Sequence, residues 1–434
     1  MTFKKIFFLL IIVFAVKGHS LAFSGPEGIP GSGKDGYNPA LTGEITLEDA
    51  LDAAFSSEPD LAAYTIEVER NQALEEQAGE FLNPTFAMEM EEFGGTGAHV
   101  GAQAMGSRYG ISQELELGGK RKKRSQAARQ KTAVARSELE EKRRALETMV
   151  KSRFAKVYTA QKTLDTQQEN LELVRNSYSI IAELVKAGEV SPLLESRAAV
   201  EVAAVENTLL QAEQGFQKAR LELATTWNSF SPEFTSVKGD FKDISEIPPM
   251  NTVLEYLAEH PRARRWDAEK LHSQAELDLA KSQIWPNVEI GGGYQKFSEN
   301  NEHAYFVEMR VPIPLFSRNQ GGIKAALAGT RIAEKREQYA LLRLKNQAAG
   351  IFRDITAARA ELIAINKTLI PAARKAFNAV SEAFRMGEEE YLSVIDAQRQ
   401  LLESTRRQAE LTSSFFELKA ELEGLTGTPL ENIL

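Results

Sequence analysis

The sequence predicts a mainly α-helical protein with a small β part, built as a tandem duplication of one strand pair followed by one long helical hairpin. Three observations support this prediction: landmarks that recur about 200 residues apart, paired segments of alternating apolar and polar residues, and long stretches with apolar residues at heptad spacing. The recurring landmarks are Leu82-Asn83-Pro84 with Ile284-Trp285-Pro286, Gly188-Glu189 with Gly387-Glu388, and Trp227-Asn228 with Leu425-Thr426.

Each copy is expected to contain a short helical stretch, then a strand pair, then a coiled-coil hairpin. A capping box at Thr46-Leu47-Glu48-Asp49 begins the first helical stretch. The expected boundaries are a first repeat 45–228 with a β-hairpin 85–117 and a coiled-coil hairpin 118–228, a proline-containing linker 229–250, a second repeat 251–427 with a β-hairpin 287–315 and a coiled-coil hairpin 318–427, and a tail 428–434.

Residues 1–22 are expected to be a secretory signal. Lys4 and Lys5 precede an apolar run from Ile6 to Val16, and Ser20-Leu21-Ala22 supplies the small residues of a cleavage site. The run is shorter than the roughly 20 apolar residues that a transmembrane helix needs. Residues 23–44 would then form an N-terminal extension.

The composition excludes several classes of function. The chain has no cysteine, so it has no disulfide, thiolate metal site, cysteine nucleophile or acylated N-terminal cysteine. Removing the three signal lysines from 52 basic residues leaves 49 against 61 acidic ones. A chain this acidic is a poor candidate for binding nucleic acid, because that binding depends on neutralising phosphates.

The paired segments are expected to be β-strands. Val288, Ile290, Gly292 and Tyr294 alternate with more polar neighbours, and the segment from Ala304 to Leu315 follows the same pattern. Strands of about ten residues with this period fit a transmembrane β-strand. A pair of ordinary soluble hairpins remains an alternative at this point.

Long coiled-coil helices are expected after each strand pair. The apolar residues of the second copy follow an alternating spacing of four and three, which is a heptad seam: Leu344, Ala348, Ile351, Ile355, Ala358, Leu362, Ile365 and Leu369. A helix over 120–186 would be about 100 Å long at 1.5 Å per residue. Pro371 lies inside the second rod and should kink it or mark an offset between shorter helices.

One tight turn is expected to join the two helices of each hairpin, near 188 in the first copy and near 387 in the second. Gly188 and Gly387 suit the left-handed position that ends a helix. Ser191, followed by Pro192, suits the start of the next helix.

The strand count predicts oligomerisation. Four strands per chain cannot close a barrel, and open strand edges are not tolerated in lipid. Three chains would supply twelve strands around a water-filled interior, continued by a barrel of twelve helical arms. The count alone also allows other multiples, such as eight strands from a dimer.

Over nearly its whole length after the signal, the sequence resembles the outer membrane factors of the TolC family. The resemblance lies in the duplicated plan, the turn glycines Gly188 and Gly387, and the segment from Gly387 to Gln398. The segments from Ile111 to Arg121 and from Val311 to Gly321 resemble the CzcC-like branch, which serves heavy-metal efflux.

This resemblance implies a homotrimeric channel in the outer membrane of a Gram-negative bacterium, with lipid around the barrel and a long periplasmic portion. Its partners would be a periplasmic adaptor and an inner-membrane pump of the resistance-nodulation-division (RND) class. The channel would passively conduct heavy-metal cations to the exterior. A multidrug or type I secretion channel of the same family remains an alternative.

The turns contain the candidate functional residues. Candidates for the pore aperture are Glu388, Glu389, Glu390, Asp396 and Glu195. Of these, Asp396 occupies a position where the family has an aspartate, whereas Ser393 and Leu194 depart from the family pattern. The three glutamates would favour cations if they line the mouth, or would form an ordinary solvated turn. Candidates for the hairpin tip and adaptor docking are Gly188, Glu189, Pro192 and Gly387.

Other kinds of function find little support in the sequence. The four histidines that follow the expected signal, His99, His260, His272 and His303, suggest no ligand pair, so no metal site or cofactor is expected. No nucleophile elbow, phosphate loop or HExxH motif occurs, which argues against an enzyme. A periplasmic coiled-coil adaptor would need a lipoyl-like β-sandwich beside a single hairpin. The basic run Lys120 to Arg124 either meets lipid phosphates or is a plain solvated helix start.

Overall fold

The computed structural model describes residues 41–102, 104–239, 244, 246–257 and 260–433. The chain divides into two units, Met1–Tyr37 and Asn38–Leu434, and all described residues belong to the second. The expected signal 1–22 and most of the expected extension 23–44 lie outside the described residues.

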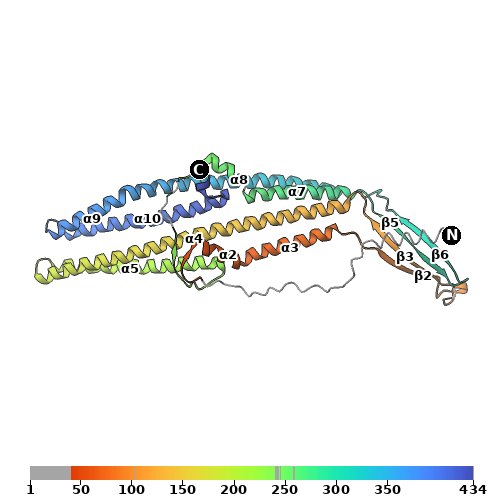
Figure 1. Cartoon of the computed structure of the whole chain (residues 1–434), viewed down its shortest axis with the longest axis horizontal. Helices are drawn as coiled ribbons and strands as arrows, with labels where there is room; N and C mark the ends of the chain where they lie inside the picture. The colour runs from red at the N-terminus through yellow and green to blue at the C-terminus, as the bar shows by residue number, and fades with distance from the viewer. Residues whose placement is uncertain (1–40, 103, 240–243, 245, 258–259, 434) are drawn as a thin grey trace. The chain divides into compact units, whose positions relative to one another are not determined.

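The two halves of the described chain repeat one order of elements (Figure 1). The first half contains β1 (Gly43–Thr46), α2 (Leu47–Ser57), α3 (Pro59–Gly79), β2 (Thr85–Glu91), η1 (Gly97–His99), β3 (Gly106–Leu115), α4 (Lys120–Ala187), α5 (Pro192–Ala224) and η2 (Thr225–Trp227). The second half contains β4 (Phe234–Lys238), α6 (Met250–Leu257), α7 (Pro261–Ser282), β5 (Val288–Phe297), β6 (Glu302–Arg310), α8 (Gln320–Ala364), the π-helix η3 (Ile365–Leu369), α9 (Ile370–Arg385), α10 (Tyr391–Thr426) and η4 (Leu430–Asn432). The predicted duplication and the mainly helical class are therefore confirmed.

A small parallel sheet joins β1 to β4. The prolines of the stretch 229–250 predict a linker, but β4 lies within it. Phe234 and Val237 of this strand are buried against Phe154, Leu223 and Trp227. The connection between the repeats is thus partly built into the core of the first repeat.

The main sheet is antiparallel throughout, in the order β2-β3-β5-β6. Because side chains alternate between the two faces of a strand, the register decides which residues share a face. One face is mainly apolar: Phe86, Met88, Met90, Tyr109, Ile111, Leu115, Val288, Ile290, Tyr294, Tyr305, Val307 and Met309. The opposite face contains the charged residues Glu89, Glu91, Arg108, Glu114, Glu289, Glu302, Glu308 and Arg310.

On the charged face, Gly293 of β5 leaves room for the ring of Phe306 on the neighbouring strand β6. A Cβ added to Gly293 would come within 1.9 Å of the Tyr109 carbonyl oxygen and 2.8 Å of Phe306 Cζ. The guanidinium carbon of Arg108 lies 3.8 Å from the centroid of the Phe306 ring. Residues larger than glycine are therefore excluded at position 293 by contact with both backbone and ring.

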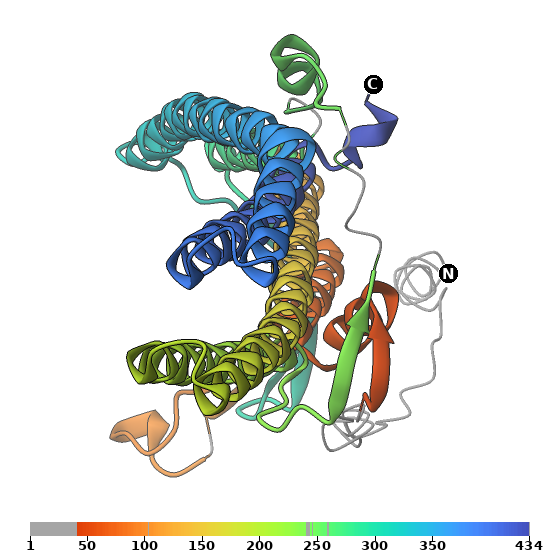
Figure 2. The same cartoon turned by 90° about the vertical axis from the view of Figure 1, so that its left-hand side faces the viewer.

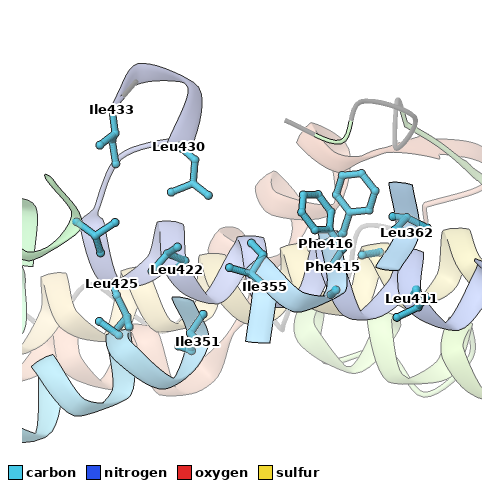
Figure 3. Packing of buried hydrophobic residues seen from close by; sticks show 14 of the residues in the cluster. Ile351, Ile355, Leu362, Leu411, Phe415, Phe416, Leu422, Leu425, Leu430 and Ile433 are labelled. Atoms are coloured by element: carbon cyan, nitrogen blue, oxygen red, sulfur yellow. The ribbon is translucent and has the colours of Figure 1, made fainter. Parts of the chain in front are cut away.

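The predicted heptad seam of the second repeat is buried from Leu344 to Ile365, whereas its last residue, Leu369, is 48% exposed. Leu344, Ala348, Ile351, Ile355, Ala358 and Leu362 of α8 are all buried. Figure 3 shows Ile351, Ile355 and Leu362 of α8 among Leu411, Phe415, Leu422 and Leu425 of α10. Each fully buried large aliphatic side chain stabilises such a core by about 1.5–3 kcal/mol.

The second rod is interrupted where Pro371 was expected to disturb it. Five residues, Ile365–Leu369, form a π-helix directly before α9, and Pro371 lies in the first turn of α9. Proline cannot donate to the carbonyl one turn earlier, and a π-turn accommodates the mismatch without ending the rod. Among the described residues, no helix is both long and apolar enough to cross a membrane.

Candidate functional site: the hairpin turns and the strand sheet

The first turn follows α4. Gly188 adopts φ +78°, its N–H donates to the Val185 carbonyl at 3.0 Å, and the Glu189 N–H donates to the Leu184 carbonyl at 3.0 Å. These two bonds satisfy carbonyls that the helix end would leave free. The Ser191 hydroxyl accepts from the Leu193 N–H at 3.3 Å, and Pro192 is the first residue of α5. The predicted glycine stop and serine cap are confirmed.

The second turn has the same construction. Gly387 adopts φ +76° and donates to the Phe384 carbonyl at 3.0 Å, while the Glu388 N–H donates to the Ala383 carbonyl at 2.9 Å. Glu390 stands at the N-cap of α10 but makes no side-chain cap bond. Glu388, Glu389 and Glu390 are all exposed. Three carboxylates are thus concentrated in one solvent-facing turn.

An apolar cluster holds the two hairpins together near their turns. Ile181 of α4, Ala198 of α5, and Tyr391, Val394 and Ile395 of α10 are buried in it. Figure 2 shows the α4/α5 and α9/α10 hairpins from the end at which their turns lie. The turn regions of the two repeats are therefore neighbours in space.

The aperture candidates do not all share one environment. Asp396 is exposed on α10, after the buried Ile395. Glu195 is half-buried on α5 and accepts a hydrogen bond from the Tyr178 hydroxyl at 3.4 Å. The structure groups Glu388–Glu390 in one turn, places Asp396 further along α10, and places Glu195 in the other hairpin.

A polar pair that the sequence does not predict lies between the hairpins. Arg399 Nη2 of α10 donates to Glu201 Oε2 of α5 at 2.8 Å, and Glu201 is only 7% exposed. This hydrogen bond and the negative charge of Glu201 raise the pKa of Arg399. Burial and the charge of Glu201 raise the pKa of the Tyr391 hydroxyl. No local pattern indicates the pair, because the two residues lie 198 positions apart.

A buried amide pair lies beside it. Gln398 Nε2 of α10 donates to Asn170 Oδ1 of α4 at 3.1 Å. Both side chains are buried, and a buried amide that lost its partner would cost about 1–3 kcal/mol. Arg399 and Gln398 together connect α10 to both helices of the first hairpin.

The basic run Lys120 to Arg124 ties strands to helices. Lys120 donates to Asn287, Lys123 Nζ donates to the Asp278 carbonyl at 3.3 Å, and Arg124 Nε donates to the Ala78 carbonyl at 2.9 Å. The guanidinium carbon of Arg121 lies 3.6 Å from the centroid of the Phe81 ring. Because these contacts are to protein groups, the interpretation as a plain solvated helix start is wrong for these four residues, whereas Lys122 is exposed.

Large apolar side chains are exposed where the strands meet the helices. We call this group the junction belt: Phe81, Trp285, Ile313, Leu315 and Phe316. Phe316 is 92% exposed. An exposed apolar surface of this kind marks contact with a partner or a membrane. Within the described ranges, no three metal-ligating side chains lie close enough together to hold an ion.

The chain matches a known protein family and several of its members. The model of the family described as outer membrane efflux protein matches residues 50–229 and 255–428. The cobalt-zinc-cadmium resistance protein CzcC of Cupriavidus metallidurans is 26% identical over 385 residues, which cover 89% of this chain and 90% of that protein. The nickel-cobalt-cadmium resistance protein NccC of Alcaligenes xylosoxydans xylosoxydans is also 26% identical, over 63% of this chain and 61% of that protein.

Solved structures share the fold. The structure of CusC superposes with a TM-score of 0.73 at 16% identity, over 89% of this chain and 94% of that one. The outer membrane protein VceC of Vibrio cholerae superposes with a TM-score of 0.70 at 18% identity, over 88% of this chain and 96% of that one. The predicted outer membrane location, with a long periplasmic helical part, is confirmed. The chain belongs to the outer membrane efflux protein family, as the resemblance to the TolC-type factors and their heavy-metal branch predicted.

Proposed function

We propose that three copies of this chain form a passive, non-enzymatic duct that carries heavy-metal cations out through the outer membrane. A periplasmic adaptor and an inner-membrane RND-type pump would deliver the cations. The observation that carries the proposal is the main sheet, which is apolar on one face, charged on the other and, within the described residues, unpaired at both edges.

The sheet edges support closure by identical copies. All neighbouring strands are antiparallel, so β2 and β6 run in opposite directions. The free edge of β6 in one copy can therefore pair antiparallel with β2 of the next. Four strands are too few to close, and three copies supply the twelve of a barrel with a water-filled interior.

The helices support the same closure. Contacts run from α3 to α4, from α4 to α7 and from α7 to α8, so α3 and α8 flank this helical layer. Both flanking helices expose large apolar side chains: Ile66 and Leu74 on α3, and Leu327, Ile332, Tyr339 and Leu342 on α8. Burying each against the next copy would stabilise the trimer by about 1.5–3 kcal/mol per side chain.

The dimensions of the apolar face suit a membrane. At its end far from the helices, Tyr109, Tyr294 and Tyr305 lie opposite one another on the three strands β3, β5 and β6; we call them the tyrosine row. Trp285 of the junction belt lies three residues before β5, and a fully extended chain from Trp285 to Tyr294 would span at most about 30 Å. A strand tilt of about 40° reduces this to about 23 Å, close to the apolar band of roughly 25 Å between the aromatic girdles of membrane barrels.

Charge supports cations as the cargo. The polar face has six glutamates and two arginines, both of which pair with glutamates: Arg108 with Glu308 at 2.9 Å, and Arg310 with Glu308 at 3.1 Å and Glu289 at 3.4 Å. A lumen lined with excess carboxylate favours cations. The relatives are named for resistance to cobalt, zinc, cadmium and nickel.

The turns would form the periplasmic end. Glu388, Glu389, Glu390, Asp396 and Glu195 are proposed to shape the aperture. Gly188, Glu189, Pro192 and Gly387 are proposed to dock the adaptor, because each turn exposes a glycine at which an added Cβ would meet nothing within 4 Å.

Two measurements test the proposal separately. Outer membranes should contain a heat-modifiable trimer that forms cation-conducting channels in planar bilayers; a monomer without conductance would refute the duct. Cells that lack the chain should accumulate cobalt, zinc or cadmium until the gene is restored. Unchanged metal content with a functioning trimeric channel would refute only the metal cargo and favour a multidrug or secretion channel.

A further inference from the structure

The apolar face of the sheet ends in a row of polar and basic residues. One step beyond the tyrosine row, the register places Met90, Ser107, Lys296 and His303 side by side across the four strands. Lys296 and His303 are direct cross-strand partners and both are exposed. We call these two residues the basic pair.

The residues of this face form successive layers along the strands. Nearest the helices lie rows with Leu115, Val288, Ile290 and Met309, then a row with Phe86, Ile111 and Val307. The tyrosine row follows, and the basic pair comes last. Successive rows lie about 7 Å apart along the strand. Apolar, aromatic and cationic layers in this order match hydrocarbon, interface and headgroup depths of a bilayer leaflet.

Two rings of the tyrosine row contact His303 of the basic pair. The rings of Tyr294 and His303 stack with centroids 5.8 Å apart, and Tyr305 meets both edge-on at 6.0 and 6.3 Å. The His303 ring is thereby held beside the tyrosines, on the same face as Lys296. An ammonium and an imidazole N–H at one depth form a donor set suited to a phosphate group.

The glutamates of the adjacent strand row belong to the opposite face. The next row outward contains Glu91, Gly106, Phe297 and Glu302. Because faces alternate with every residue, these glutamates point toward the proposed lumen and leave the basic pair on the lipid side. The row that contains Lys296 has no carboxylate, so none in that row repels a phosphate that approaches along the membrane face.

We infer that the basic pair and the tyrosine row bind the phosphorylated headgroup of the outer-leaflet glycolipid, lipid A. The inference rests on the proposed function, because only a sheet in the outer membrane presents this face to lipid. Lys296 and His303 contact a lipid A phosphate, the tyrosines lie at the level of the sugar backbone, and the apolar rows contact the acyl chains. A trimer has three such sites.

The test uses the full-length trimer in detergent and native mass spectrometry with bisphosphorylated lipid A, dephosphorylated lipid A and phosphatidylglycerol. Lys296→Gln should weaken lipid A binding about fivefold, since one cation near a membrane surface contributes about 1 kcal/mol. Lys296→Arg should restore binding. His303→Gln should have a smaller effect. The control Lys345→Gln, at an exposed lysine of α8, should bind like the unmodified chain.

Three other results would overturn the lipid A site or its assignment. Equal binding by Lys296→Gln and the unmodified chain, or equal binding of the two forms of lipid A, overturns the site. Equal binding of phosphatidylglycerol overturns the glycolipid assignment in favour of a general anionic-lipid contact. Oligomeric state and conductance are recorded on the same preparation. Absence of trimers and conductance overturns the proposed function as well, whereas conducting trimers that do not distinguish the lipids overturn this inference alone.

Discussion

Arg399 and Glu201 connect the two hairpins of the chain, with Nη2 of Arg399 donating to Oε2 of Glu201 at 2.8 Å. The glutamate is nearly enclosed, while the arginine side chain is 63% exposed. The pair is therefore asymmetric: removing the arginine leaves a buried carboxylate, whereas neutralising the glutamate leaves a cation that water can solvate.

This asymmetry predicts the order of effects in a mutant cycle. Arg399→Ala should destabilise the fold by about 1–2 kcal/mol, which is the cost of breaking a buried pair reduced for the exposure of Arg399. Glu201→Gln should cost less. The double variant Arg399→Ala/Glu201→Gln should be only slightly less stable than Glu201→Gln alone. Thermal unfolding of all four proteins measures this. Additive single effects would show that the two side chains do not interact.

A second prediction concerns Gly293. Gly293→Ala should impair assembly of the strand sheet, because its Cβ would clash with the Tyr109 carbonyl oxygen. The amount of heat-modifiable oligomer in outer membranes should fall severalfold. The matched control is Gly329→Ala on α8, where an added Cβ has nothing within 4 Å. That change should be neutral or stabilise the helix by up to about 1 kcal/mol. Normal oligomer from Gly293→Ala would contradict the strand register.

A third prediction concerns pH. His260 is buried at the N-cap of α7, where Nδ1 accepts from the Arg262 N–H at 3.1 Å and Nε2 lies 2.7 Å from the Gly424 carbonyl oxygen. Burial lowers the pKa of His260 below its usual 6.5, with Arg262 and Arg144 acting in the same direction and the Gly424 hydrogen bond and Glu141 acting against it.

The unfolded chain therefore binds this proton more readily than the folded one. The stability contributed by His260 is fully present above about pH 6.5 and is lost as pH falls through the lowered pKa. Stability measured by denaturant between pH 7.5 and 5 should fall more steeply for the unmodified chain than for His260→Asn, whose side chain can still cap the helix. Parallel curves for the two proteins would contradict this role.

A fourth prediction concerns the second turn. Replacing Glu388, Glu389 and Glu390 with glutamine should reduce the cation preference of single channels, because a trimer would lose nine carboxylates from one mouth. Reversal potentials in a salt gradient measure the preference. Glu334→Gln, at an exposed position of α8, is the control and should leave it unchanged. A triple variant with the original reversal potential would assign the turn a purely structural role.

Local features of the fold were predictable from local sequence. The seam from Leu344 to Leu362 is buried as its heptad spacing predicted, because helical periodicity requires only neighbouring residues. Gly188 and Gly387 end their helices in the left-handed conformation for the same reason. The strand β4 was missed because the prolines around it indicated a linker, and its partner β1 lies at the other end of the first repeat.

By itself, the sequence determined the duplicated order of elements, the long rods, the glycine turns and the family. These depend on composition and on periodicity over a few turns of chain. Only the tertiary structure decided that Arg399 meets Glu201, that Phe306 lies over Gly293, and that Lys296 stands beside His303 on the apolar face. Such contacts depend on strand register and helix pairing between distant segments, and a register shift of one residue would move every strand side chain to the other face.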